Sequence, residues 1–340
     1  MFCSCFGSPE SASDFEAHNV RHHFFDVGLA HDMNPKHRES MEDAHVVKVP
    51  FMGEESTGFF AIYDGHGGSE ASLQVSKTLH SLIEAEIKKK GTNTSPTMRE
   101  CFEAAYATMD EQLKPLAGDP GTTAVTCLLR REGPTLRIYV ANAGDARAVL
   151  CRSGRALRLS YDHKPSDDKE RQRIAELGGF VTNDRVNGIL AVSRALGDHP
   201  FKKWVVSTPF WVDSDIVRSD SMLLLACDGL WDVIDDQEAV DLVRGPLSLT
   251  DPSDSLSLSL SLSLSRSLSL SLSLSCSLSR ISRSACLVCL FLTDPSDSRS
   301  LSLSLTRREG LMRALAPHAR SEPPCVYTPA KGLFTCTSTG

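Results

Sequence analysis

The chain has 340 residues, enough for one large domain or two ordinary ones. Its 41% apolar and 23% charged residues are typical of a globular protein, and its net charge of −7 argues against a nucleic-acid-binding function, which normally needs a basic face. The 11 cysteines are odd in number and dispersed along the chain, which predicts reduced thiols in an intracellular protein, cytoplasmic or nuclear. The longest apolar run, residues 285–292, is too short for a membrane helix, so we expect no membrane association.

Four regions of different character follow one another along the chain. Residues 1–20 form a short polar extension, and residues 21–244 carry ordinary helix and strand signals. Residues 245–306 are dominated by Leu and Ser, and residues 307–340 form a basic tail that we expect to be disordered. One domain over 21–244 is therefore the predicted organisation.

The second region contains the predicted elements, in groups of strands and long pairs of helices. Strands are predicted over 59–63, 122–130, 136–142, 146–151 and 222–227, and helices over 70–90, 98–113, 167–177 and 236–244. Ser166 is the expected N-cap of the third helix, and Asp235 with Glu238 has capping-box spacing at the start of the fourth. This grouping predicts an α+β fold with helices packed outside the sheets.

Leu and Ser alternate over residues 256–264 and again over 268–274. Period-two alternation is typical of a half-buried strand, but Leu and Ser alone do not specify a strand register. A CT dinucleotide repeat read in any frame also gives alternating Leu and Ser codons. We interpret the segment as translated simple-repeat DNA, with a structural strand as the alternative.

Acidic residues recur where predicted apolar strands end. Asp64 and Asp228 each follow such a strand, Asp145 lies in a hairpin turn, and Glu42-Asp43 form an acidic pair. Taken singly, each has an ordinary alternative, a turn or a solvated face. Together they could converge on one cleft, where a bound cation would offset their desolvation. Oxygen donors without clustered Cys or His favour Mg²⁺ or Mn²⁺ over Zn²⁺.

The order of these residues along the chain resembles one family. The strings RESMEDAH, FFAIYDGHGGSEAS, GTTAVTCLL, YVANAGDARAVL, LSYDHKPSDDKERQRI, RVNGILAVSRALGD and LLLACDGLWDVIDDQEAV are similar to the ordered motifs of the type 2C protein phosphatases. The resemblance implies a central antiparallel β-sandwich flanked by helices on both faces. It also implies a metal-dependent serine/threonine phosphatase whose partners are phosphorylated proteins, and we expect a monomer.

The resemblance implies a binuclear Mg²⁺ or Mn²⁺ centre. Asp64 would bridge the two ions. Glu42 and the backbone carbonyl of Gly65 would complete one site, and Asp228 would ligate the other ion. Two ions that share a carboxylate can activate a water and stabilise displacement at phosphorus.

The remaining candidate residues surround that centre in the family. Asp43 would hydrogen-bond a metal-bound water, and Asp145 would belong to a weaker third metal site near Asp232. Arg38 would bind the phosphate through its planar guanidinium. His66 would act as the general acid that protonates the departing serine or threonine oxygen.

The sequence departs from the family pattern after Arg244. Family members continue to a strand headed by an Asp-Asn dipeptide whose Asp is a metal ligand, and no Asp-Asn follows Arg244 here. We therefore expect a sandwich that lacks its last strand or strands and a metal site that lacks one carboxylate. An impaired pseudophosphatase or phosphoprotein-binding module is thus the alternative function, and a hydrolase of non-protein phosphoesters is a third.

Overall fold

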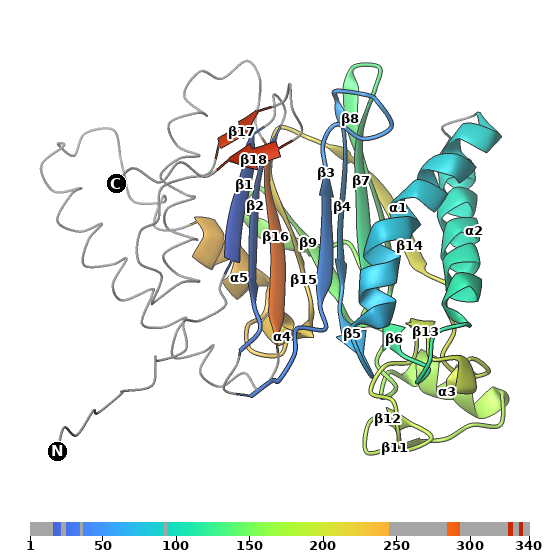
Figure 1. The fold of residues 1–340 in the computed structure, drawn as a ribbon. Helices are drawn as coiled ribbons and strands as arrows, with labels where there is room; N and C mark the ends of the chain where they lie inside the picture. The colour runs from blue at the N-terminus through green and yellow to red at the C-terminus, as the bar shows by residue number, and fades with distance from the viewer. Residues whose placement is uncertain are drawn as a thin grey trace, which may run out of the picture.

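The computed structural model describes residues 16–21, 25–34, 37–91, 94–244, 284–292, 326–328 and 333–335. Two antiparallel sheets stack face to face, and helices cover the outer face of each sheet (Figure 1). This arrangement confirms the α+β sandwich with helices on both faces that the sequence predicted.

The first sheet has five strands in the order β14-β8-β7-β4-β3. Its strands are β3 (Ala44–Lys48), β4 (Thr57–Tyr63), β7 (Ala124–Glu132), β8 (Thr135–Ala143) and β14 (Phe210–Ile216). Helices α1 (Glu70–Lys90) and α2 (Ser95–Leu113) cover its outer face. Strand β4 alternates as a doubly buried strand should, because Phe59 and Tyr63 face these helices while Phe60 and Ile62 face the second sheet.

The second sheet has six strands in the order β1-β2-β16-β15-β9-β10. Its strands are β1 (Glu16–Arg21), β2 (Phe25–Asp32), β9 (Arg147–Arg152), β10 (Arg155–Arg158), β15 (Asp220–Ala226) and β16 (Ala285–Leu292). Helices α4 (Asp228–Trp231) and α5 (Asp236–Arg244) pack against its outer face.

Strand β16 corrects the expectation that the sandwich lacks its last strand. It pairs along its length with β2 on one side and with β15 on the other. Val288 and Leu290 point into the core between the sheets, whereas Cys289 and Phe291 point toward α4 and α5. A strand buried on both faces needs an unbroken apolar run, and this segment supplies one. The alternating Leu and Ser residues of 256–274 lie outside the described residues.

The helix starts test two capping predictions. The N-cap of α3 (Asp168–Glu176) is Asp167, not Ser166, because the Asp167 carboxylate accepts two backbone N–H bonds of the first turn. The predicted cap of α5 is confirmed on one side, since the backbone N–H of Glu238 donates to Asp235 Oδ1 at 2.8 Å.

A small lobe lies at the end of the sandwich that is lowest in Figure 1. It contains α3 and the short elements β11 (Val181–Thr182), β12 (Arg185–Val186) and η1 (His199–Phe201). A three-stranded sheet, ordered β13-β6-β5, joins the lobe to the sandwich through β5 (Gly65–His66), β6 (Gly121–Thr122) and β13 (Leu196–Gly197).

Two more short strands, β17 (Val326–Thr328) and β18 (Leu333–Thr335), pair with each other within the region predicted to be a tail. Among the helices in the described ranges, none is long and apolar enough to cross a membrane.

Candidate active site

A pocket opens at the end of the sandwich where several strands terminate. Asp64 follows β4, Asp228 follows β15 after one residue, and Asp145 lies in the turn between β8 and β9. All three carboxylates line the pocket. Seven of the eight residues predicted for the site line it, namely Arg38, Glu42, Asp64, Gly65, His66, Asp145 and Asp228.

Backbone contacts hold Asp64 and Glu42 close together. The Asp64 carbonyl accepts the Thr123 N–H at 2.9 Å and the Thr122 hydroxyl at 3.1 Å, which fixes the end of β4. Gly65 approaches the Glu42 carbonyl so closely that a Cβ at Gly65 would overlap it. Glycine at position 65 therefore lets the two acidic segments meet.

Asp43, the eighth predicted residue, lies behind the pocket wall and is 8% exposed. The Cys227 thiol donates to its Oδ2 at 3.4 Å, while Oδ1 is buried without a hydrogen-bond partner among the described residues. Burial raises the pKa of Asp43, and hydrogen bonds and the charge of Arg38 offset this only in part.

The donor atoms near Asp43 fit a hard divalent cation. Ligand atoms of Asp43, Asp64 and Cys227 lie within 4.8 Å of one another, and Glu42 and Asp228 line the adjoining pocket. Burial raises the pKa of the Cys227 thiol, so this thiol stays protonated and the carboxylates are the donors. A cation that prefers oxygen ligands would stabilise these neighbouring carboxylates, one of which has a buried oxygen without a hydrogen-bond partner among the described residues.

His66 contacts a carboxylate that sequence reasoning missed. Its Nε2 lies 2.9 Å from Oδ1 and 2.8 Å from Oδ2 of Asp198. Burial disfavours the charged ring, but the hydrogen bond to Asp198 and the nearby carboxylates outweigh it and raise the pKa of His66 above its usual value. Asp198 belongs to the string RVNGILAVSRALGD, whose residues carried no assigned role, and no local pattern links it to a histidine so distant in the chain.

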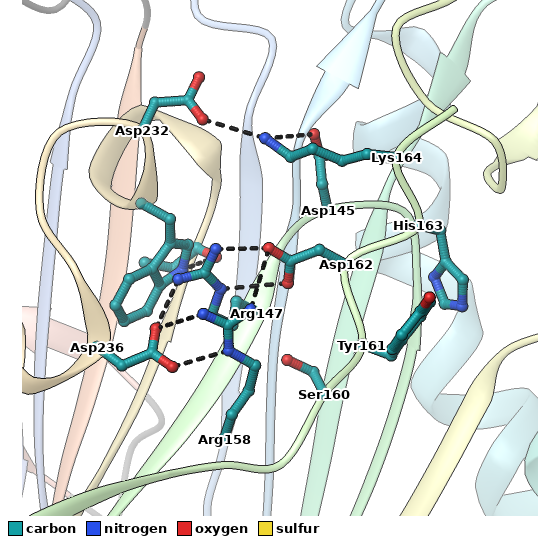
Figure 2. Close-up of polar contacts among 12 residues, drawn as sticks. Asp145, Arg147, Arg158, Ser160, Tyr161, Asp162, His163, Lys164, Asp232 and Asp236 are labelled. Atoms are coloured by element: carbon teal, nitrogen blue, oxygen red, sulfur yellow. Dashed lines mark hydrogen bonds and ion pairs between the residues drawn. The ribbon is translucent and has the colours of Figure 1, made fainter. Parts of the chain in front are cut away.

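A lysine occupies the region predicted for a weaker third metal ion. Lys164 Nζ lies 3.2 Å from Asp232 Oδ1 and 3.9 Å from Asp145 Oδ2, between the two carboxylates (Figure 2). Burial raises the pKa of Asp145, and the Lys164 charge lowers it in part. A cation that binds here must compete with this ammonium group, which the sequence motifs do not indicate.

Ser284 stands directly before β16 and also lines the pocket. Its backbone carbonyl packs against Gly229 at the start of α4, where a Cβ would overlap it. Strand β16 thus places Ser284, a residue with a hydroxyl group, at the pocket. The neighbouring strands end in carboxylate residues at the same pocket. No sequence signal marks Ser284 as a site residue, because the segment before it has the pattern of low-complexity sequence.

The opposite side of the pocket is formed by the lobe, and includes Arg185 and residues 190–192. Arg38 is exposed at the pocket, and its positive charge acts on Asp43. The pocket therefore combines an acidic floor with arginines at its edge, a distribution suited to a phosphate held beside a cation.

Comparisons with known proteins identify the family of the chain. The model of the family Protein phosphatase 2C matches residues 27–262. Protein phosphatase 2C homolog 1 of Saccharomyces cerevisiae is 41% identical over 243 residues, which cover 67% of this chain and 84% of that protein. Protein phosphatase 2C homolog 1 of Schizosaccharomyces pombe is 41% identical over 227 residues, and the match covers 65% of each chain.

Solved structures share the fold at lower identity. The serine-threonine phosphatase 2C from Toxoplasma gondii superposes with a TM-score of 0.62 at 19% identity, covering 83% of this chain and 100% of that one. A C. elegans sex determining protein also gives a TM-score of 0.62, at 23% identity, covering 88% of this chain and 69% of that one. Because the family model matches more than half of this chain, the chain belongs to the protein phosphatase 2C family of metal-dependent serine/threonine phosphatases.

Proposed function

We propose that this chain hydrolyses phosphoserine and phosphothreonine in protein substrates with two Mg²⁺ or Mn²⁺ ions, and a weaker third. The observation that carries the proposal is the convergence of carboxylates from separate strand ends on one pocket that also contains Arg38 and His66. Carboxylates gathered in this way repel one another, and divalent cations relieve the repulsion.

Glu42, Asp64, Asp228 and the backbone carbonyl of Gly65 would hold the two ions. When bound, the ions supply Lewis acidity and a nucleophilic water. The orphaned oxygen of Asp43 would orient the attacking water from behind the pocket.

The other groups act on the substrate. Arg38 would bind two phosphate oxygens through its guanidinium and neutralise part of their charge. His66 would donate a proton to the ester oxygen as its bond to phosphorus breaks, because a serine or threonine alkoxide is a poor leaving group.

The proposed setting is intracellular, cytoplasmic or nuclear. The support comes from the thiols, since Cys101, Cys127, Cys151, Cys227, Cys286 and Cys289 are all free and buried.

Phosphate release from a phosphothreonine peptide tests the function. The purified chain should turn over with Mn²⁺ or Mg²⁺ and lose turnover with a chelator. Asp64→Asn should lower kcat by about 10²–10³-fold or more, because it removes a charge shared by both ions. The matched control is Asp168→Asn, whose side chain is 99% exposed on α3 and should leave turnover unchanged. Full activity of Asp64→Asn would contradict the metal assignment.

A second candidate, an impaired chain that binds phosphoproteins without turnover, is favoured by Ser284. A hydroxyl adds no charge to the pocket, so metal affinity would fall below that of a site completed by another carboxylate. Calorimetric titration with Mn²⁺ separates the two candidates, since two sites with turnover support the enzyme and one site without turnover supports the binding module. Ser284→Asp should tighten Mn²⁺ binding about tenfold, a gain of about 1.4 kcal/mol, and Ser284→Ala should not.

A further inference from the structure

The small sheet β13-β6-β5 brings two distant segments of the chain to one point. His66 of β5 pairs with Gly121 of β6, and Gly121 pairs on its other side with Gly197 of β13. Asp198, the residue after Gly197, therefore arrives beside His66. This sheet has only two residues in each strand, and its register brings the two residues together.

His66 and Asp198 differ in how much of each side chain is exposed to solvent. The Asp198 side chain is 4% exposed, whereas the His66 side chain is 29% exposed and lines the pocket. Asp198 lies behind the ring, and its oxygens meet Nε2 at 2.8 and 2.9 Å. Because a carboxylate only accepts hydrogen bonds, Nε2 must carry a hydrogen, which leaves Nδ1 as the ring nitrogen that can give up or take a proton.

The backbone around this pair is specialised for the contact. A Cβ at Gly121 would overlap both Asp198 Oδ2 and His66 Nε2, so the pair fits only over a glycine. Asp198 itself adopts a φ of 53°, a left-handed conformation that costs energy for a residue with a side chain. Strained conformations of this kind persist where the surrounding structure holds them.

Two further contacts hold the strained segment. The Gly197 N–H donates to Asp110 Oδ1 on α2 at 2.8 Å. The Asp198 carbonyl accepts the Phe201 N–H at 2.8 Å, which begins η1. The backbone that carries the Asp198 carboxylate is therefore anchored to α2 and to η1.

We propose that Asp198 is the positioning residue for His66, holding the imidazole through Nε2 and thereby assigning proton transfer to Nδ1. The inference rests on the proposed phosphatase function. In that reaction a water oxygen forms a new bond to phosphorus as the ester P–O bond breaks. The Nδ1 proton passes to the departing serine or threonine oxygen, and the proton released by the water restores His66.

Two substrates whose leaving groups differ in their need for a proton can distinguish a positioning role of Asp198 from a purely structural one. Asp198→Asn preserves side-chain shape and tolerates a left-handed φ, but its amide can donate to Nε2 and so permits the wrong tautomer. We expect kcat on a phosphothreonine peptide to fall about a hundredfold. On para-nitrophenyl phosphate, whose leaving group needs no proton, kcat should change by less than about threefold. An equal loss on both substrates would overturn the proposal.

The matched control is Asp110→Asn, which weakens the support of Gly197 without touching His66. Asp110 is 6% exposed and also accepts a hydrogen bond from Lys202 Nζ at 2.8 Å. This variant should lower the melting temperature and change kcat on the two substrates by the same factor. A selective loss on the phosphopeptide in this control would also count against a special role for Asp198.

The tautomer of His66 can also be measured in the wild-type chain, so this test does not depend on whether a variant folds. Nitrogen NMR of the isotopically labelled, Mg²⁺-loaded chain at alkaline pH should show neutral His66 with its hydrogen on Nε2. A hydrogen on Nδ1 would refute the positioning role even if the chain is an active phosphatase. A wild-type chain without metal-dependent turnover would instead refute the proposed function and leave the tautomer result standing.

Discussion

The two sheets of the sandwich recruit their strands from the chain in different ways. All strands of the five-stranded sheet and both of its covering helices come from residues 44–216, and β3, β4, β7 and β8 neighbour one another in chain order. In the six-stranded sheet, β16 inserts between β2 and β15, although residues 245–284 separate it from the preceding helix. One sheet is assembled from successive neighbours, and the other depends on a distant segment.

This difference shows what a central strand position requires. Strand β16 lies between two strands and between two layers, so its backbone must pair on both edges and its side chains must be apolar on both faces. An eight-residue apolar run satisfies both conditions whatever sequence surrounds it. Truncations and core substitutions can test whether the distant strand contributes as much to stability as the local ones.

Truncation after Arg244 should have the largest effect. It removes β16, leaves β2 and β15 without their shared partner, and exposes both apolar layers that β16 touches. The loss should remove most of the ~5–15 kcal/mol that stabilises a domain, so no cooperative thermal transition should be seen by circular dichroism. Truncation after Leu292 retains β16 and is the control, with a transition expected near that of the full chain. If the shorter form melts cooperatively at the same temperature as the longer one, β16 is dispensable.

Leu290→Ala and Leu128→Ala compare the two sheets at single residues. Both side chains are fully buried, Leu290 between the sheets and Leu128 beneath α1 and α2. Each substitution leaves a cavity and should lower the free energy of unfolding by about 2–5 kcal/mol. Urea denaturation measures both losses. A large loss for Leu128→Ala with none for Leu290→Ala would show that the distant strand is only loosely attached.

Arg147→Met, on the outer face of the six-stranded sheet, should lower the free energy of unfolding by less than the core substitutions do. Arg147 and Arg158 both pair with Asp162 and Asp236, which joins α5 to β9 and β10 (Figure 2). The Arg147 side chain is 9% exposed and stacks over Trp231, whereas that of Arg158 is 42% exposed.

Removing Arg147 leaves the half-buried carboxylates of Asp162 and Asp236 partly uncompensated. The expected loss is about 2 kcal/mol, below the ~3–5 kcal/mol of a fully broken buried pair because Arg158 remains. Arg158→Met is the matched control and should cost less than about 1 kcal/mol. Equal losses in the two variants, measured by thermal denaturation, would contradict this ranking by burial.

Much of the first sheet and its helices could be predicted from local pattern. Helix α1 spans the residues that helical spacing of apolar side chains indicated, and β4 matches its apolar run to within two residues. The same run indicated that Asp64 would emerge at a strand end. Local spacing is informative here because the neighbouring elements in the chain are also neighbours in space.

The residues of the candidate site also fall into two groups, those with local sequence signals and those that depend on distant partners. Asp64, Asp228 and Asp145 follow short-range signals, and the structure places all three at one pocket. Asp198 and Lys164 escaped prediction because each acts on a partner from another part of the chain. No periodicity within either segment records which charge it will meet.

By itself, the sequence determined the family, the buried faces of the main strands and helices, and the acidic residues at strand ends. Only the tertiary structure decided that the apolar run 285–292 completes the second sheet, that Ser284 enters the pocket with it, and that Asp198 reaches His66. The physical reason is that an apolar run indicates that a segment will be buried, but it does not indicate which strands the segment will pair with. Long-range pairing is set by the backbone hydrogen bonds and packing that remain to be satisfied once the local elements have formed.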